Sequence, residues 1–162
     1  MKKQLKSFGF AFKGIYSALK EEGHMRFHLV AAVYVIVFSF FFDLSVTEFA
    51  VVALIIGAVI SAELINTALE RLCDRVTTEF DTNIKYIKDV CAAAVLVLAA
   101  AAIAVAFLIF FDIKKITAIA LNIINNPLLL ILFILSLIIS VVFIWLGPIG
   151  IKQLITKDKK SA

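Results

Sequence analysis

The chain has few of the residues that build most soluble proteins. Its 162 residues include 2 Cys, 2 Pro and 6 Gly, and 17% are charged while 63% are hydrophobic. So few cysteines exclude a disulfide-built scaffold, and so little proline and glycine exclude collagen-like and low-complexity chains. Soluble domains are about 45–50% apolar and about 25% charged. The hydrophobic core of a soluble domain of 162 residues could not bury the additional apolar residues of this chain. The composition therefore predicts a protein whose solvent is the lipid bilayer.

The apolar residues form four stretches that end where charged residues begin. A helix needs about 20 residues to cross the hydrocarbon, and only the last two stretches reach that length unaided. The second becomes long enough only if it continues through Glu63 to about Leu72. The stretches are 27–42, 49–62, 90–111 and 116–151.

The fourth stretch contains its own breaks. Asn122, Asn125, Asn126 and Pro127 predict a loop, followed by a span from about residue 128 to 146 that Pro148 and Gly150 would close. The predicted fold class is an all-α polytopic membrane helix bundle with four transmembrane helices.

The basic residues predict how the bundle is oriented. All but two of the 16 lysines and arginines precede the first span, lie between the second and third, or follow the fourth. The exceptions are Lys114 and Lys115. By the positive-inside rule both termini are expected in the cytoplasm, with the protein in the cell membrane. The net charge of +4 is then a property of the membrane surface and does not indicate a nucleic-acid partner.

The N-terminal residues 4–20 are amphipathic. At about 100° per residue, apolar side chains such as Leu5, Phe8 and Phe12 fall on one side, with lysines beside them. Such a helix is expected to lie in the membrane interface. The alternative is a cytoplasmic helix that packs on the bundle.

One helical face of the second span carries polar residues at its cytoplasmic end. Glu63, Asn66, Thr67, Glu70 and Asp74 fall within about 100° of one another. A carboxylate as deep in the membrane as Glu63 costs about 2.5–3.5 kcal/mol on insertion scales. It therefore needs a partner, a proton or a function.

Glu63 and Glu70 are suited to different tasks. They lie about 10.5 Å apart along the helix axis, which is too far to share one metal ion. The deep Glu63 could exchange a proton as a general base, and the shallower Glu70 could bind Mg²⁺ together with substrate phosphates. The alternative is that Glu63 and Asn66 only join helices by hydrogen bonds.

Two further polar clusters lie at the same level, residues 20–28 and Lys88-Asp89. His24 and His28 are four residues apart and could hold a metal. No third ligand follows at helical spacing, so their role stays open. The sequence has none of the familiar nucleotide-binding or zinc motifs, and any phosphate chemistry must use another construction.

Several motifs together resemble a known family. The run from Glu63 to Asp74 resembles the E-x-x-N-[ST]-A-x-E-x-x-x-D signature of the bacterial integral-membrane diacylglycerol kinase and undecaprenol kinase family. Further blocks match at ungapped spacing over roughly residues 5–111. These blocks are Lys13-Gly14 before Glu22, Met25-Arg26-Phe27-His28, and Ile87-Lys88-Asp89-Val90 before Ala93-Ala94-Val95-Leu96.

The resemblance implies a fold and an activity. Residues 1–111 would form a lipid kinase domain with an amphipathic surface helix and three family-like transmembrane helices. Residues 112–162 would add a loop, a fourth transmembrane helix and a basic cytoplasmic tail. The family members are trimers that move the γ-phosphate of ATP onto a lipid hydroxyl. The product would be phosphatidic acid from diacylglycerol, a step of phospholipid biosynthesis, or undecaprenyl phosphate from undecaprenol.

The resemblance also implies roles for single residues. Glu63 would be the catalytic base and would contact the lipid substrate, and Glu22 and Glu70 would hold Mg²⁺. Asn66 and Asp74 would support the site. The residues that would bind the nucleotide are Glu22, Glu70, Glu79, Lys88 and Asp89.

Two other functions compete with an ATP-dependent lipid kinase. An intramembrane Glu beside Asn is also how proton relays are built, so a non-enzymatic proton or cation pathway is one alternative. A membrane assembly subunit is the other. The residues do not distinguish diacylglycerol from undecaprenol as the acceptor, although Met25-Arg26-Phe27-His28 favours the undecaprenol type.

Overall fold

The computed structural model describes residues 2–161, with side chains for residues 4–156, and in this range the chain forms six α-helices. Five basic residues that counted toward the predicted orientation, Lys2, Lys3, Lys157, Lys159 and Lys160, lie outside the described side chains. The helices are α1 (Lys2–Glu21), α2 (Gly23–Phe41), α3 (Val46–Val76), α4 (Thr82–Phe110), α5 (Ile113–Asn125) and α6 (Pro127–Ser161).

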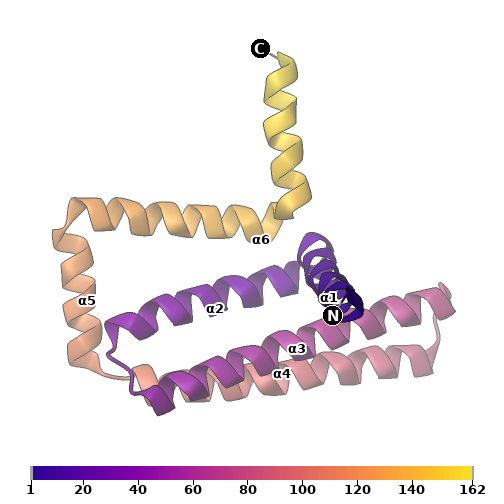
Figure 1. The fold of residues 1–162 in the computed structure, drawn as a ribbon, viewed down its shortest axis with the longest axis horizontal. Coiled ribbons are helices and arrows are strands. Elements are labelled where there is room, and N and C mark those ends of the chain that lie inside the picture. The colour runs from indigo at the N-terminus through magenta and orange to yellow at the C-terminus, as the bar shows by residue number, and fades with distance from the viewer. Residues whose placement is uncertain (1, 162) are drawn as a thin grey trace.

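Four of the helices in the described range are long and apolar enough to cross a membrane: α2, α3, α4 and α6. Their long segments run side by side (Figure 1), with α3 packed most extensively on α4, and α2 in contact with both α3 and α6. Large apolar side chains such as Leu54, Ile103 and Leu108 point outward. This is the arrangement expected when lipid is the solvent, and it confirms an all-α membrane bundle.

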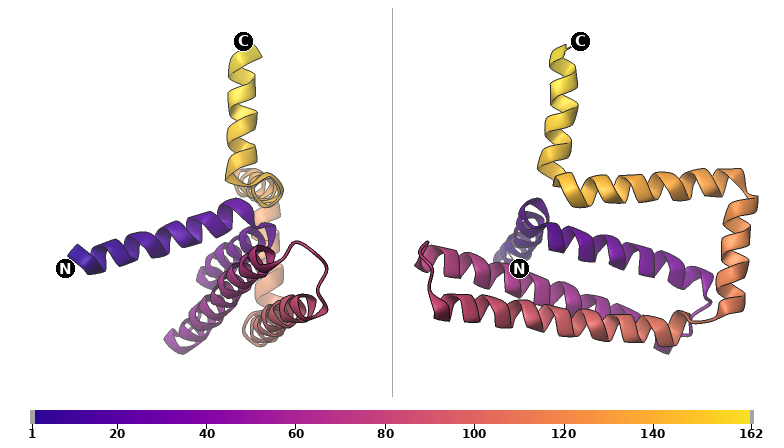
Figure 2. Two further views of the ribbon diagram at one scale, coloured as in Figure 1. Left: turned by 90° about the vertical axis from the view of Figure 1, so that its right-hand side faces the viewer. Right: turned by 180° about the vertical axis from the view of Figure 1, so that it is seen from behind.

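The glutamate-rich face of the second span and the α1–α2 junction lie at one end of the bundle, which we call the polar end. Glu21 at the end of α1 forms an ion pair with Arg71 of α3. α1 itself runs crosswise to the long helices (Figure 2). Its apolar side chains, among them Phe8, Phe12 and Tyr16, are exposed. The crosswise direction and the exposed apolar side suit a helix lying in a membrane interface.

The expected loop between the third and fourth spans is wrong, because residues 113–125 form α5. Asp112 starts this helix by accepting hydrogen bonds from the backbone N–H groups of Lys114 and Lys115 at 3.0 and 3.1 Å. Asn126 starts α6 in the same way, accepting from the N–H of Leu128 at 3.1 Å. The asparagine before Pro127 therefore marks a helix start, a position that asparagine favours as strongly as it favours loops.

α5 lies crosswise at the end of the bundle opposite the polar end (Figure 1). It joins the end of α4 to the start of α6, and Lys115 Nζ donates a hydrogen bond of 2.8 Å to the Phe42 carbonyl after α2. The Phe42 ring also packs edge-on against Phe110 at the end of α4, with 5.1 Å between ring centroids. The hydrogen bond thus ties α5 to the residue that follows α2, and the ring contact ties that residue to the end of α4.

α6 does not end at Pro148, as the sequence predicts, but turns there. Gly147 has φ 62° and ψ 179°, and the chain resumes a helix that leaves the bundle crosswise at the polar end (Figure 2). Proline has no N–H, so Pro148 cannot donate to the Ile144 carbonyl four residues earlier. Arg26 of α2 replaces that donor, with 2.9 Å from its Nε to the Ile144 oxygen.

Arg26 also holds the end of α1. Its Nη1 donates to the carbonyls of Leu19 and Lys20 at 3.2 and 3.4 Å, and the side chain is buried, with 8% exposed. We call this set of bonds from Arg26 to α1 and α6 the Arg26 clamp. Further along α2, the Tyr34 hydroxyl is 3.0 Å from Ser136 Oγ of α6. The fourth span is thus attached to α2 by polar contacts at two levels.

Gly147→Ala is expected to destabilise the protein by about 1–2 kcal/mol, which is the cost of a left-handed backbone for a residue with a Cβ. The added Cβ would also lie 2.9 Å from Arg26 Nη1, so the clamp would have to shift. Thermal unfolding in detergent measures the change. Gly57→Ala in α3 is the control, because a Cβ there meets nothing within 4 Å. Equal unfolding temperatures for the two variants would contradict the expectation.

Candidate functional site

The site is built on the face of α3 that packs against its neighbours. Val52, Val59, Glu63, Asn66 and Thr67 are the buried members of this face. They recur every three, four or seven residues, which places them along one side of a helix. The face is therefore apolar toward the opposite end of the bundle and polar from Glu63 onward, as the sequence predicts. Glu63 is buried, with 4% of its surface exposed.

Other polar groups of the polar end surround Glu63. None of the ion pairs among the described side chains includes its carboxylate. The fold therefore buries an acid at membrane depth beside other titratable groups and leaves it without a cationic partner in an ion pair. The titratable groups close enough to act electrostatically on it are His28, His24, Glu70 and Glu22.

Glu22 reaches this group from the α1–α2 junction. It is the N-terminal cap of α2, with an extended backbone, and its side chain makes no capping hydrogen bond. A cap residue that does not bond to its own helix can direct its carboxylate toward a ligand. The junction therefore brings a second acid, which is 41 positions away in sequence from Glu63, to the same site.

Asn66 lies between the deep and shallow acids of α3. Its Nδ2 donates a hydrogen bond of 2.8 Å to Glu70 Oε1. Its Oδ1 is buried and has no hydrogen-bond partner among the described residues. A buried acceptor without a donor costs about 1–3 kcal/mol, which is a cost that a bound ligand could remove. Among the buried side-chain nitrogen and oxygen atoms of the described residues, the Asn66 oxygen is therefore the one without a hydrogen-bond partner.

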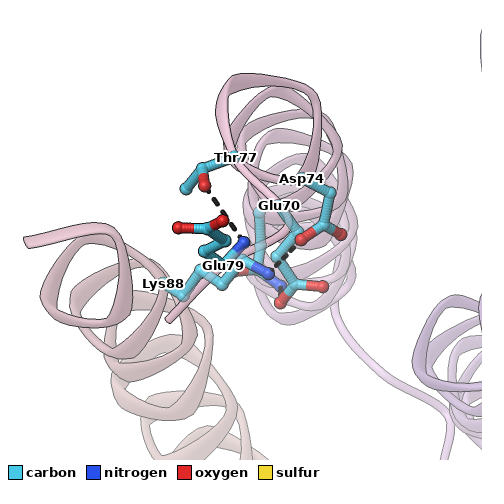
Figure 3. A network of polar contacts seen from close by, with 6 residues as sticks. Glu70, Asp74, Thr77, Glu79 and Lys88 are labelled. Atoms are coloured by element: carbon cyan, nitrogen blue, oxygen red, sulfur yellow. Dashed lines mark hydrogen bonds and ion pairs between the residues drawn. The ribbon is translucent and has the colours of Figure 1, made fainter. Parts of the chain in front are cut away.

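Lys88 brings α4 into the site. Its ammonium group forms an ion pair with Asp74 of α3 and is also close enough to interact electrostatically with Glu70. Figure 3 shows Lys88 reaching from α4 toward the two α3 acids. Glu79, in the connection between α3 and α4, lies in the same group, and its backbone N–H donates to Thr77 Oγ1 at 3.0 Å.

Asp89 is placed differently from the other predicted site residues. Its carboxylate accepts from Lys85 Nζ at 2.6 Å, one turn earlier on the exposed side of α4. Neighbours on a helix point about 100° apart, so Asp89 and Lys88 do not share a direction. The structure thus gathers Glu22, Glu63 and the Asn66–Glu70 pair, joins Lys88 to Asp74, and leaves Asp89 paired with Lys85.

Sequence reasoning missed two contributors to the site. The Arg26 clamp holds the α1–α2 junction that carries Glu22, and the ion pair of Arg71 with Glu21 holds the same junction on α3. An arginine at the start of an apolar span is a signal for a buried role. Its partners are backbone carbonyls, however, and no side-chain pattern reveals those.

The donor atoms of the site suit a hard cation. Glu22, Glu70 and the Asn66 Oδ1 offer only oxygen, which is what Mg²⁺ prefers. Within the described part of the chain, no three His, Cys, Asp or Glu side chains are arranged to hold a metal by themselves. Mg²⁺ is usually held by one or two carboxylates together with substrate phosphates. The residues therefore fit a Mg²⁺ ion that arrives with a phosphorylated substrate.

Comparison with known proteins agrees with this chemistry. Residues 9–110 match the model of the prokaryotic diacylglycerol kinase family. The undecaprenol kinase of Bacillus subtilis (strain 168) is 37% identical over 105 residues, which cover 65% of this chain and 85% of that relative. No solved structure matches the chain. The matched region ends at the end of α4, so α5 and α6 lie outside it.

Proposed function

The chain belongs to the prokaryotic diacylglycerol kinase family and is a membrane lipid kinase, and we propose that Glu63 is its catalytic base. Its substrates are ATP and a lipid alcohol. The observation that carries the assignment is the burial of Glu63 near the acids and histidines of the polar end, with no ion pair to any side chain between residues 4 and 156. A general base must have a free lone pair for the proton and must lie where the lipid hydroxyl can reach it, and a carboxylate without an ion pair meets the first requirement.

The proposed reaction is a direct transfer. The lipid oxygen forms a bond to the γ-phosphorus of ATP, and the bond from that phosphorus to the bridging oxygen breaks, releasing ADP. The hydroxyl proton passes to the Glu63 carboxylate. Since phosphoryl transfer is mostly positioning and charge neutralisation, the buried face of α3 contributes chiefly by excluding water from the transferred group.

The nucleotide is proposed to bind at the outer part of the polar end. Lys88 donates to a phosphate oxygen, with Asp74 holding its ammonium group in place. Glu22 and Glu70 would hold Mg²⁺, which neutralises phosphate charge when bound, and Asn66 supports Glu70 through its 2.8 Å hydrogen bond. Glu79 would contact the nucleotide from the connection between α3 and α4, and Asp89 would do so from α4 after leaving its ion pair with Lys85.

The lipid acceptor is proposed to be diacylglycerol or undecaprenol. The matched relative is named an undecaprenol kinase, and its similarity to the present chain supports undecaprenol. The product is the corresponding lipid phosphate. Comparing initial rates of labelled phosphate transfer from ATP to each lipid, with purified protein, tests the choice directly.

The assembly and orientation are also proposals. We propose a homotrimer in the cell membrane with both termini in the cytoplasm, where ATP is available. Residues 1–111 form the kinase unit, and residues 112–162 are an addition to it. Among the basic residues whose side chains the structure describes, all but Lys114 and Lys115 lie on the side of the polar end, which supports the orientation. Chemical crosslinking in membranes tests the trimer.

Glu70→Gln is expected to raise the Mg²⁺ concentration needed for half-maximal activity by about tenfold or more. The variant removes a charge but keeps an oxygen that accepts from Asn66, so the fold should not change. Even the loss of a residue that only supports a metal ligand costs about 10–100-fold in metal affinity. A Mg²⁺ titration at saturating ATP measures the shift. Asp43→Asn, exposed at the far end of the bundle, is the control, and identical titration curves for the two variants would remove Glu70 from the metal site.

A further inference from the structure

An apolar cavity begins beside the catalytic carboxylate. This near cavity, of about 280 Å³, lies between α2, α3 and α4. His28, Val59 and Ile60 line it at the polar end. Val59 is one turn before Glu63 on the same face of α3, and His28 is close enough to act electrostatically on Glu63. A lipid whose hydroxyl meets Glu63 can therefore place the start of its tail in the near cavity.

A second and larger apolar cavity lies at the other end of the bundle. This far cavity, of about 520 Å³, lies between α2, the end of α4, α5 and α6 and is partly open. Ile119, Ala120 and Phe133 are among its lining residues. Since α5 and α6 lie outside the matched residues 9–110, the far cavity exists only because of the additional helices.

The two cavities adjoin each other. Val35 of α2 and Phe110 of α4 line both of them. Along α2 the linings run from Phe27 to Phe42, which corresponds to about 22 Å at 1.5 Å per residue. The hydrocarbon core of a bilayer is about 30 Å thick, so the combined path passes beyond the midplane.

The lining determines what can fill this path. Among its residues the only polar side chains are His28 at the near end and Tyr34. The Tyr34 hydroxyl is already within hydrogen-bond distance of Ser136 and Ser140, at 3.0 and 3.2 Å. A cavity of this kind at membrane depth accepts hydrocarbon and not water.

We propose that the near and far cavities together bind the tail of a long, single-chain lipid alcohol of the polyprenol type, with its hydroxyl at Glu63. The inference rests on the proposed role of Glu63. It adds the place where the lipid tail lies and, from the length of that path, a choice between the two proposed classes of acceptor. The acyl chains of diacylglycerol occupy one leaflet, about half of the hydrocarbon thickness, and would end before the far cavity. A single polyprenol chain can follow one path past the midplane, and α5 and α6 serve to receive its end.

Ala120→Phe tests the far cavity, because the added ring fills it from α5. Ala118→Phe is the matched control, since both alanines are exposed residues of α5 and only Ala120 lines the cavity. The full-length variants are assayed with Mg²⁺-ATP and three acceptors: undecaprenol, the short polyprenol farnesol, and diacylglycerol. Ala120→Phe is expected to lower kcat/KM for undecaprenol by about tenfold, the size of effect that overpacking a well-fitted cavity produces. Its rate with farnesol should equal that of the control.

Two outcomes would overturn the tail path. One is a decrease in kcat/KM that Ala120→Phe shows equally with undecaprenol and with farnesol. The other is that the unchanged protein has a higher kcat/KM for diacylglycerol than for undecaprenol, and that Ala120→Phe and Ala118→Phe have the same kcat/KM for diacylglycerol.

A binding experiment separates the tail path from catalysis. An undecaprenol analogue with a photoreactive group at the end of its tail is expected to label α5 or α6 in the full chain, and unlabelled undecaprenol should compete. Label confined to α3, which does not line the far cavity, or scattered at random positions would overturn the path even if the protein phosphorylates lipids. If Glu63→Gln leaves activity unchanged while the probe still labels α5, the proposed base fails and the tail path stands.

Discussion

Glu63→Gln is expected to lower lipid phosphorylation by about 10²–10⁴-fold, the usual contribution of a positioned general base. The amide has nearly the same shape as the carboxylate but cannot take the hydroxyl proton. Because Glu63 is buried at membrane depth and has no ion pair among the described residues, replacing it leaves no charge unpaired. The variant should therefore fold and insert as well as the unchanged protein.

The measurement is phosphate transfer from labelled ATP to undecaprenol or diacylglycerol in detergent or vesicles. Glu48→Gln is the matched control, since it makes the same change on the same helix at the opposite end of the bundle. Glu48 forms a capping box with Ser45, and glutamine can replace glutamate in that motif. A Glu63→Gln variant with full turnover would show that another group accepts the proton.

Arg26→Met is expected to destabilise the protein by about 2–3 kcal/mol. The change removes the donors to the carbonyls of Ile144, Leu19 and Lys20 but keeps an apolar side chain of similar length. The Ile144 oxygen cannot recover a helical bond, because the residue four positions later is Pro148. The loss should therefore appear as detachment of α6 and loosening of the α1–α2 junction.

Thermal unfolding in detergent measures the stability, and limited proteolysis after residue 126 reports on the attachment of α6. Arg75→Met, which is exposed at the end of α3, is the control for loss of an arginine. Arg26→Lys should recover only part of the stability, since an ammonium group cannot replace the planar fork of a guanidinium that reaches two helices. If Arg26→Met unfolds at the same temperature as Arg75→Met, the clamp does not stabilise the fold.

The arrangement along α3 was predictable because residues three or four positions apart lie on the same face of a helix. Glu63, Asn66 and Glu70 recur at three- and four-residue intervals, so they share a face whatever surrounds them, and the structure confirms this face. The polar end was also predictable in outline, because charges in a chain with 17% charged residues must gather where water is available. The resemblance in four blocks then led to the family that the comparisons show.

The additional region was predicted less well, for local reasons. Asn126 favours a loop and a helix cap equally, and only the N–H groups that it accepts from distinguish the two. Pro148 predicts that a helix stops, and it does not predict that Arg26, 122 residues earlier, will replace the missing donor. The pairing of Asp89 with Lys85 follows from their four-residue spacing on α4, which the sequence reasoning passed over in favour of a shared role for Lys88 and Asp89.

By itself, then, the sequence determined that this is an all-α membrane protein, which face of α3 carries the acids, and which family motifs it holds. These conclusions follow from the composition of the whole chain and from the 3.6-residue period of a helix, which relates residues that are close in sequence. Only the tertiary structure decided that Glu22 and His28 lie close enough to Glu63 to act on it electrostatically, that Arg26 attaches α6, and that Val35 and Phe110 line two apolar cavities. These depend on how helices far apart in sequence pack, and apolar lining residues that look interchangeable in the chain acquire distinct positions only through that packing.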